Sequence, residues 1–70
     1  MRHEQVRILQ YLKSSPLAFF SVAEISRRVG DRKQYEENRR WAQPHLTRLV
    51  EEGLVECDVM GHYRFLKDGE

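Results

Sequence analysis

Apolar residues change their spacing near Gly53. Before that glycine they recur every three or four residues, as on one face of a helix, and after it they alternate with polar residues, as in a half-exposed strand. A chain of 70 residues forms one domain with a small core. The sequence therefore predicts a single α+β domain over residues 1–70, with helices first and a β-hairpin at the end.

Two helices are predicted in the first part of the chain. The first runs from Arg2 to Ser14 and ends before Pro16, because the residue that precedes a proline is disfavoured in a helix. The second runs from Val22 to Val29. Ser21 and Glu24 have the spacing of a capping box, in which each side chain accepts a hydrogen bond from the other residue's amide.

A third helix is predicted from Arg39 to Glu52. Pro44 is tolerated only in the first turn of a helix, so we prefer a start near Trp41. Gly30 is expected to end the second helix in a left-handed conformation. The polar residues from Asp31 to Asn38 are predicted to form a loop that includes at most one helical turn.

Three strands are expected besides the helices. The apolar residues from Leu17 to Phe20 are too few for a helix and suit a short buried strand. Two longer strands, from Leu54 to Val59 and from His62 to Leu66, flank Met60 and Gly61. Because glycine supplies the positive φ that a tight turn needs, these two strands are predicted to form a hairpin.

The apolar faces of these elements define the expected core. Its predicted members are Val6, Leu9, Leu12, Phe20, Ile25, Val29, Leu46, Leu49, Leu54 and Phe65. On the third helix Ala42 shares the inner face with Leu46 and Leu49. Ile8 and Tyr11 lie at the edge of the first helix's apolar stripe, and they are the expected contacts of a homodimer, if one forms.

Two segments resemble the winged helix-turn-helix superfamily of transcription regulators. Residues Ser21 to Gly30 are similar to the second helix of such domains, and His45 to Glu56 are similar to the end of a recognition helix that leads into the first wing strand. The resemblance implies three helices, a short strand after the first, and a two-stranded wing. The connection from Asp31 to Asn38 is longer than in the common pattern.

The resemblance also implies a binding surface. In such domains the third helix enters the major groove of double-stranded DNA, where arginine can read guanine and glutamine can read adenine. The expected DNA contacts lie on that helix, in the wing and in the lengthened turn. They are Arg39, Arg40, Gln43, Thr47 and Arg48 on the helix, Arg64 in the wing, and Arg32 and Lys33 in the turn.

Charge leaves two functions open. The net charge is only +1, but the segment from Arg27 to Arg48 contains seven basic residues and only three acidic ones. Such a patch favours sequence-specific DNA binding. Four acidic residues follow at the base of the expected wing, namely Glu51, Glu52, Glu56 and Asp58. They favour the alternative, a winged helix that binds another protein and no DNA.

Other classes of function have weaker support. No nucleophile with a base, glycine-rich phosphate loop or carboxylate pair on one helix face is present, so no enzyme is expected. Cys57 and His62 would face each other across a tight hairpin, with Asp58 nearby. A zinc site uses four ligands, or three and a water, so no metal or cofactor is expected. Tyr35 and Trp41 form either an aromatic binding patch or, more often, packing for the turn.

The expected location is the cytoplasm. No apolar stretch reaches the roughly 18 residues of a membrane span. The N-terminus lacks the apolar segment of a signal peptide. The single cysteine, Cys57, fits a reducing compartment.

Overall fold

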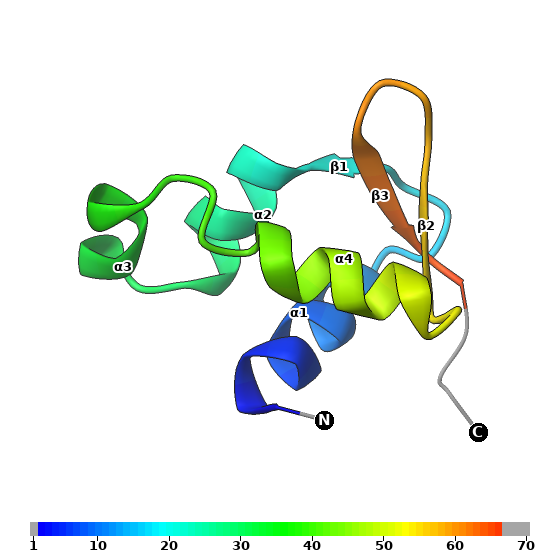
Figure 1. Cartoon of the computed structure of the whole chain (residues 1–70), viewed down its shortest axis with the longest axis horizontal. Coiled ribbons are helices and arrows are strands. Elements are labelled where there is room, and N and C mark those ends of the chain that lie inside the picture. The colour runs from blue at the N-terminus through cyan, green and yellow to red at the C-terminus, as the bar shows by residue number, and fades with distance from the viewer. Residues whose placement is uncertain (1, 67–70) are drawn as a thin grey trace.

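Four helices and a three-stranded antiparallel sheet form within residues 2–66, the part of the chain that the computed structural model describes (Figure 1). The elements are α1 His3–Lys13, β1 Phe20–Ser21, α2 Val22–Val29, α3 Arg32–Glu37, α4 Gln43–Glu51, β2 Val55–Cys57 and β3 His62–Phe65. The α+β class is confirmed, with one helix more than expected. Residue 1 and residues 67–70 of the predicted domain lie outside the described residues.

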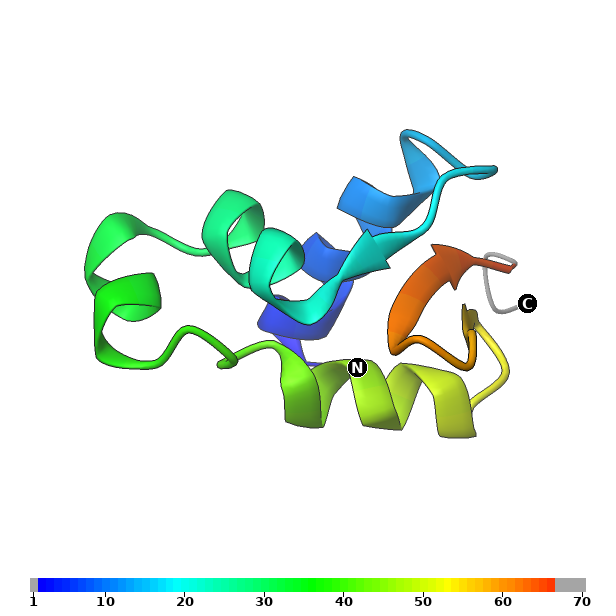
Figure 2. The ribbon, with the colours of Figure 1, turned by 90° about the horizontal axis from the view of Figure 1, so that it is seen from above.

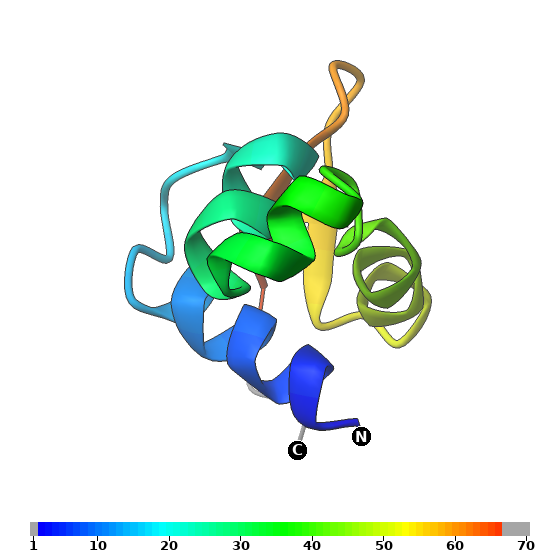
Figure 3. The ribbon, with the colours of Figure 1, turned by 90° about the vertical axis from the view of Figure 1, so that its left-hand side faces the viewer.

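The sheet joins the hairpin to the short strand after α1. Its order is β1-β3-β2, with Phe20 opposite Tyr63 and Val55 opposite Phe65. The hairpin tip points away from α1, and α3 lies at the opposite end of the molecule from the hairpin (Figures 2 and 3). The sheet therefore closes one end of the helical layer.

The first strand is shorter than predicted and begins later. A hydrogen bond from the Ala18 amide to the Ser15 carbonyl, 3.0 Å long, closes a turn with Pro16 in its second position, which proline favours. The chain is still reversing direction at Leu17, whose side chain is 85% exposed. Pairing with β3 starts only at Phe20, so the expected burial of Leu17 is wrong.

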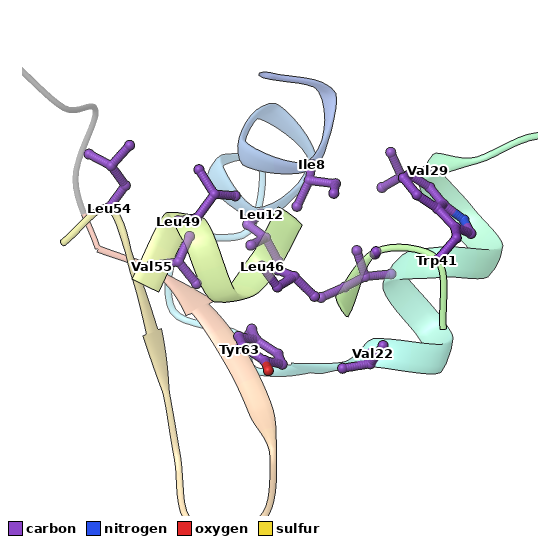
Figure 4. Packing of buried hydrophobic residues seen from close by; sticks show 12 residues of the cluster. Ile8, Leu12, Val22, Val29, Trp41, Leu46, Leu49, Leu54, Val55 and Tyr63 are labelled. Carbon is purple, nitrogen blue, oxygen red and sulfur yellow. The ribbon is translucent and has the colours of Figure 1, made fainter. Parts of the chain in front are cut away.

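The core lies between α1, α2, α4 and the sheet (Figure 4). Its buried apolar members are Ile8, Leu12, Val22, Ile25, Val29, Trp41, Ala42, Leu46, Leu49, Leu54, Val55 and Tyr63. The inner face of α4 is confirmed. Four predicted core residues are only partly buried, namely Val6, Leu9, Phe20 and Phe65.

On α1 the buried face is rotated from the prediction. Gln5, Ile8 and Leu12 are buried, whereas Val6 and Leu9 lie at the edge. The apolar stripe is wide, and packing against both α2 and α4 selects its centre at Ile8. Ile8 is fully buried within the monomer, so it cannot serve as the dimer contact that the sequence suggested.

A short helix, α3, replaces the loop expected at residues 31–38. Asp31 caps it by accepting a hydrogen bond from the Gln34 amide at 2.7 Å. Arg32 and Glu36, four residues apart on its surface, form an ion pair at 3.1 Å. These local interactions stabilise a six-residue helix that buries none of its own residues, which is why apolar periodicity did not reveal it.

Gly30 ends α2 in an extended conformation with φ −81° and ψ 171°, so the expected left-handed cap is wrong. Its lack of a side chain serves a close contact instead. A Cβ atom at this position would lie 2.6 Å from Nε1 of Trp41. The indole therefore lies directly over Gly30, where only glycine leaves room for it.

Trp41 joins the start of α4 to α2. Its Nε1–H donates a hydrogen bond to the Ser26 carbonyl at 2.8 Å, and the Ala42 amide donates to Ser26 Oγ at 3.2 Å. Ser26 is fully buried and Trp41 is 7% exposed. Of the two interpretations of Trp41, packing of the turn is thus confirmed, and the ring is not a surface patch.

The first turns of α2 and α4 follow the sequence signals in part. Ser21 Oγ accepts from the Glu24 amide at 3.1 Å, as expected, but the Glu24 carboxylate pairs with Arg28 at 3.5 Å, and only the serine half of the capping box is present. In α4, Pro44 lies in the first turn and Ala42 is the cap, so the later start of this helix is confirmed.

Replacement of Gly30 by alanine should test the close contact with Trp41. We expect Gly30→Ala to lower the free energy of unfolding by about 1–3 kcal/mol, the range for overpacking a tight site, as measured in denaturant titrations. In a Trp41→Leu background, which removes the indole, the same alanine should have a smaller effect. An equal loss in both backgrounds would contradict the assignment.

Candidate nucleic-acid interface

The exposed side of α4 carries a row of polar side chains that begins just before the helix. Arg40 lies in the connection from α3, and Gln43 and Thr47 follow at helical spacing. Thr47 Oγ1 donates to the Gln43 carbonyl at 3.0 Å, and Gln43 Nε2 approaches Thr47 Oγ1 at 3.5 Å. The structure thus brings together three of the predicted DNA contacts.

A buried tyrosine of the sheet extends this row. Arg40 Nη2 donates to Gln43 Oε1 at 2.6 Å, and Gln43 Nε2 donates to the hydroxyl oxygen of Tyr63 at 3.0 Å. Burial raises the pKa of Tyr63 above its ordinary value of 10.0, although the hydrogen bond from Gln43 acts in the opposite direction. The phenol therefore stays protonated at neutral pH.

Tyr63 was not among the residues predicted from the sequence. Phe65 was a predicted core residue of the same strand, and Tyr63 lies two positions earlier, on the same face of that strand. That spacing was the available signal, because a tyrosine at an inward position usually directs its hydroxyl to a polar partner.

Three of the expected DNA contacts, Arg32, Arg48 and Arg64, are already paired with carboxylates. Arg32 pairs with Glu36 at 3.1 Å and Arg48 with Glu52 at 2.8 Å, each across one helical turn. The hydrogen bond that Arg48 donates to the Glu52 carboxylate raises the pKa of Arg48 above its ordinary value. Arg48 lines a shallow groove beside the start of α1, together with Arg2 and Gln5.

Arg64 is held by Glu56 of β2 and by Phe19, which directly precedes β1. It pairs with Glu56 across the β2–β3 ladder, and its guanidinium lies 4.9 Å from the centre of the Phe19 ring. A phosphate that binds Arg64 must therefore compete with Glu56.

Three cations of α3 and of the connection from α3 to α4 form no ion pair within residues 2–66: Lys33, Arg39 and Arg40. All three side chains are exposed. Arg39 lies 5.6 Å above the ring of Tyr35, which is half-buried beside it. These residues are available to an anionic partner without loss of a carboxylate contact.

Most of the charges beside the two ends of α4 oppose its macrodipole, and Arg48 in the last turn is the exception. Arg39 and Arg40 precede its positive N-terminal end, and Glu51 and Glu52 lie at its negative C-terminal end. Charges of these signs are unfavourable at these ends, by up to about 1 kcal/mol each on an exposed surface. Helix stability therefore does not explain the arrangement, which leaves a positive surface at the helix start.

The hairpin register differs from the one that would join Cys57 to His62. Cys57 lies opposite Tyr63, because the connection between β2 and β3 spans Asp58 to Gly61 rather than two residues. Asp58 Oδ1 accepts from the amides of Met60 and His62, both at 2.9 Å, and Gly61 adopts φ 81°. Among the described residues no three potential metal ligands come together.

Comparison of the chain with protein-family models, with curated proteins and with solved structures finds no match. Within residues 2–66 no helix has both the length and the apolar character needed to cross a membrane.

The ionised Asp58 carboxylate in the hairpin turn should make the stability of the fold depend on pH. The pKa of Asp58 lies below its ordinary value of 3.8, chiefly because the His62 amide donates a hydrogen bond to the carboxylate. A lowered folded-state pKa means that the ionised form stabilises the fold above about pH 4, and that this contribution is lost as the pH falls through the lowered value.

Replacement of Asp58 isolates that contribution. An asparagine keeps an oxygen acceptor but does not titrate in this range. We expect the difference in urea midpoint between wild type and Asp58→Asn to favour wild type at pH 6 and to shrink at pH 2. Parallel midpoints for the two proteins over this range would contradict the assignment.

Proposed function

We propose that the chain is a cytoplasmic winged-helix domain that recognises specific sequences in double-stranded DNA through α4. One observation carries the proposal. Arg39 and Arg40, without a carboxylate partner in the described part of the chain, stand at the exposed start of a helix beside Gln43 and Thr47. Arginine and glutamine are the side chains best suited to read base edges.

The order of the elements supports this assignment. A winged helix places a recognition helix after a packed second helix and before a hairpin. Here α4 follows α2 after the short helix α3, and the β2–β3 hairpin, which contacts α4, comes next (Figure 1). In this proposal α3 is an insertion in the turn between the two helices, and it contributes Lys33 to the DNA-facing side.

The charge distribution suggests how the helix would approach DNA. The start of α4 is basic and its end is acidic, so phosphates would attract the first turn and repel Glu51 and Glu52. N-terminal residues of a recognition helix are also those that most often contact bases. A tilted approach, with the first turn deepest in the major groove, satisfies both conditions.

Replacement of Arg40 by alanine tests the proposal. If Arg40 reads a base, DNA affinity should fall by about 1–3 kcal/mol for the preferred sequence; if it holds only a phosphate, the loss should be smaller and equal for all sequences. Titrations of mixed-sequence duplexes at low and moderate salt measure both. Arg28→Ala is the matched control, since Arg28 lies on α2 and is already paired with Glu24.

Wild-type protein that fails to bind any duplex at low salt would overturn the proposal. So would an affinity that is indifferent both to salt and to the Arg40 substitution, because phosphate contacts release counterions.

Replacement of Glu36 by glutamine should have the opposite effect. It removes a repulsive charge and frees Arg32 from its ion pair, so we expect tighter binding by about 0.2–1 kcal/mol at low salt, in the range of exposed ion pairs. Glu37→Gln removes an equal charge from the same helix without freeing an arginine. A larger gain for Glu36→Gln is expected; equal gains would show that Arg32 does not reach DNA.

Protein binding is the alternative function, and a specific observation favours it. Leu17 is 85% exposed and Phe19 41% exposed beside β1, and Val59 and Met60 project from the hairpin tip. Exposed apolar residues of this size often mark contacts with other proteins. Absence of DNA binding in the titrations above, with the fold intact by circular dichroism, would favour this alternative.

A further inference from the structure

Tyr63, Gln43 and Arg40 form a chain of hydrogen bonds from the core to the surface. Tyr63 is 6% exposed and belongs to the central strand of the sheet, whereas Arg40 is exposed in the connection before α4. Gln43 lies between them and contacts both, at 2.6 Å to Arg40 and 3.0 Å to Tyr63. Figure 4 shows the Tyr63 ring within the core, below α4.

The chemistry of the partners determines which way the Gln43 amide points. A guanidinium can only donate hydrogen bonds, so the amide atom that faces Arg40 must be the oxygen. The amide nitrogen must then face Tyr63, whose hydroxyl oxygen accepts from it. Each amide atom of Gln43 therefore has a partner, and the two bonds fix the orientation of the amide.

Arg40, by contrast, keeps most of its donors. One Nη2 hydrogen is used by Gln43, and the other four N–H groups of a guanidinium remain. No carboxylate within residues 2–66 pairs with it. A guanidinium with two neighbouring free donors matches O6 and N7 of guanine in the major groove.

We propose that Tyr63 acts through Gln43 as a positioning residue, which holds the Arg40 guanidinium ready to read a guanine. The inference rests on the proposed function and adds the base recognised and the residue that sets it. A long exposed arginine has many rotamers, and ordering it on binding costs conformational entropy. The bond to Gln43 restricts those rotamers before DNA arrives, and Tyr63 fixes Gln43 because it is itself immobilised in the sheet.

The backbone around Arg40 is also ordered. The Arg40 amide donates to Asn38 Oδ1 at 3.0 Å, and the Gln43 amide donates to the Arg40 carbonyl at 3.0 Å. With the main chain held on both sides, the side-chain bond to Gln43 determines where the guanidinium points.

The test compares guanine preference in matched variants. A preferred duplex is first selected by the wild-type protein from a randomised pool. Each guanine of that duplex is then replaced in turn by 7-deazaguanine, which lacks the N7 acceptor. The guanine preference is the ratio of the affinity for the unmodified duplex to the affinity for the modified one. Tyr63→Phe removes only the hydroxyl, and Gln43→Met removes the amide. Tyr11→Phe is the matched control, since Tyr11 is a half-buried tyrosine on α1 that packs against Phe20.

We expect the replacement of one particular guanine by 7-deazaguanine to weaken DNA binding by wild type about tenfold. Arg40→Ala should abolish that preference. Tyr63→Phe and Gln43→Met should each reduce it about two- to tenfold, the range of one hydrogen bond, and the double variant should be no worse than either single one. Tyr11→Phe should leave it unchanged. The salt dependence should stay the same in Tyr63→Phe, because no charge is lost.

Three results would overturn the inference while leaving DNA binding intact: a preferred sequence without a guanine contact, full preference in Tyr63→Phe, or additive losses in the double variant. If Tyr63→Phe fails to fold, as judged by circular dichroism, Gln43→Met on the surface decides, and full preference in that variant overturns the inference. Failure of wild type to bind any duplex at low salt would overturn both proposals together.

Discussion

The hydrogen bonds between Trp41 and Ser26, and between Ala42 and Ser26, determine where α4 lies. Both connect the start of α4 to a fully buried residue of α2, and the indole fits over Gly30 because that residue has no side chain. Buried polar groups that lose such partners cost about 1–3 kcal/mol each. In a small domain with a marginal core, these bonds are therefore a large share of what holds the two helices together.

The position of α4 in turn sets the surface that the chain presents. With Trp41 and Ala42 turned inward, the neighbouring Arg39 and Arg40 are directed to solvent at the start of the helix. One turn later Leu46 is buried and Thr47 is exposed, as helical spacing requires. The same junction thus explains the buried face and the exposed cations, and the unfavourable placement of those cations against the helix macrodipole is maintained by tertiary contacts.

Local signals predicted much of this fold. The bounds of α2, the late start of α4 at Pro44 and the buried face of α4 each follow from interactions within a few residues, such as caps, proline geometry and apolar spacing. The buried face of α1 did not follow from such local signals, because packing against two other helices selected Ile8 from a broad apolar stripe. The helix α3 has a local cap at Asp31 but no apolar face, so periodicity carried no signal for it.

The candidate interface was predicted as a set of residues but not as an arrangement. Which arginines pair with carboxylates follows in part from spacing, as for Arg32 with Glu36 and Arg48 with Glu52, four residues apart on one helix. The pairing of Arg64 with Glu56 depends on hairpin register, and the contact of Gln43 with Tyr63 depends on how the sheet packs against α4. Both join residues that only the tertiary fold brings together.

Some cations of the candidate interface are paired with carboxylates and others are not. This difference affects how such a domain would discriminate among DNA sequences. A guanidinium that must leave a carboxylate to reach a phosphate gains less than a free one, since an uncompensated negative charge remains near the DNA. With Arg40 directed to a base, phosphate attraction in the proposed function depends mainly on Lys33 and Arg39. Neutralising about two phosphates gives a salt slope near −2, far weaker than that of large repressors. With so little sequence-independent attraction, discrimination must come from base contacts, and the ordered Arg40 beside Gln43 and Tyr63 is the part of the surface arranged to supply one.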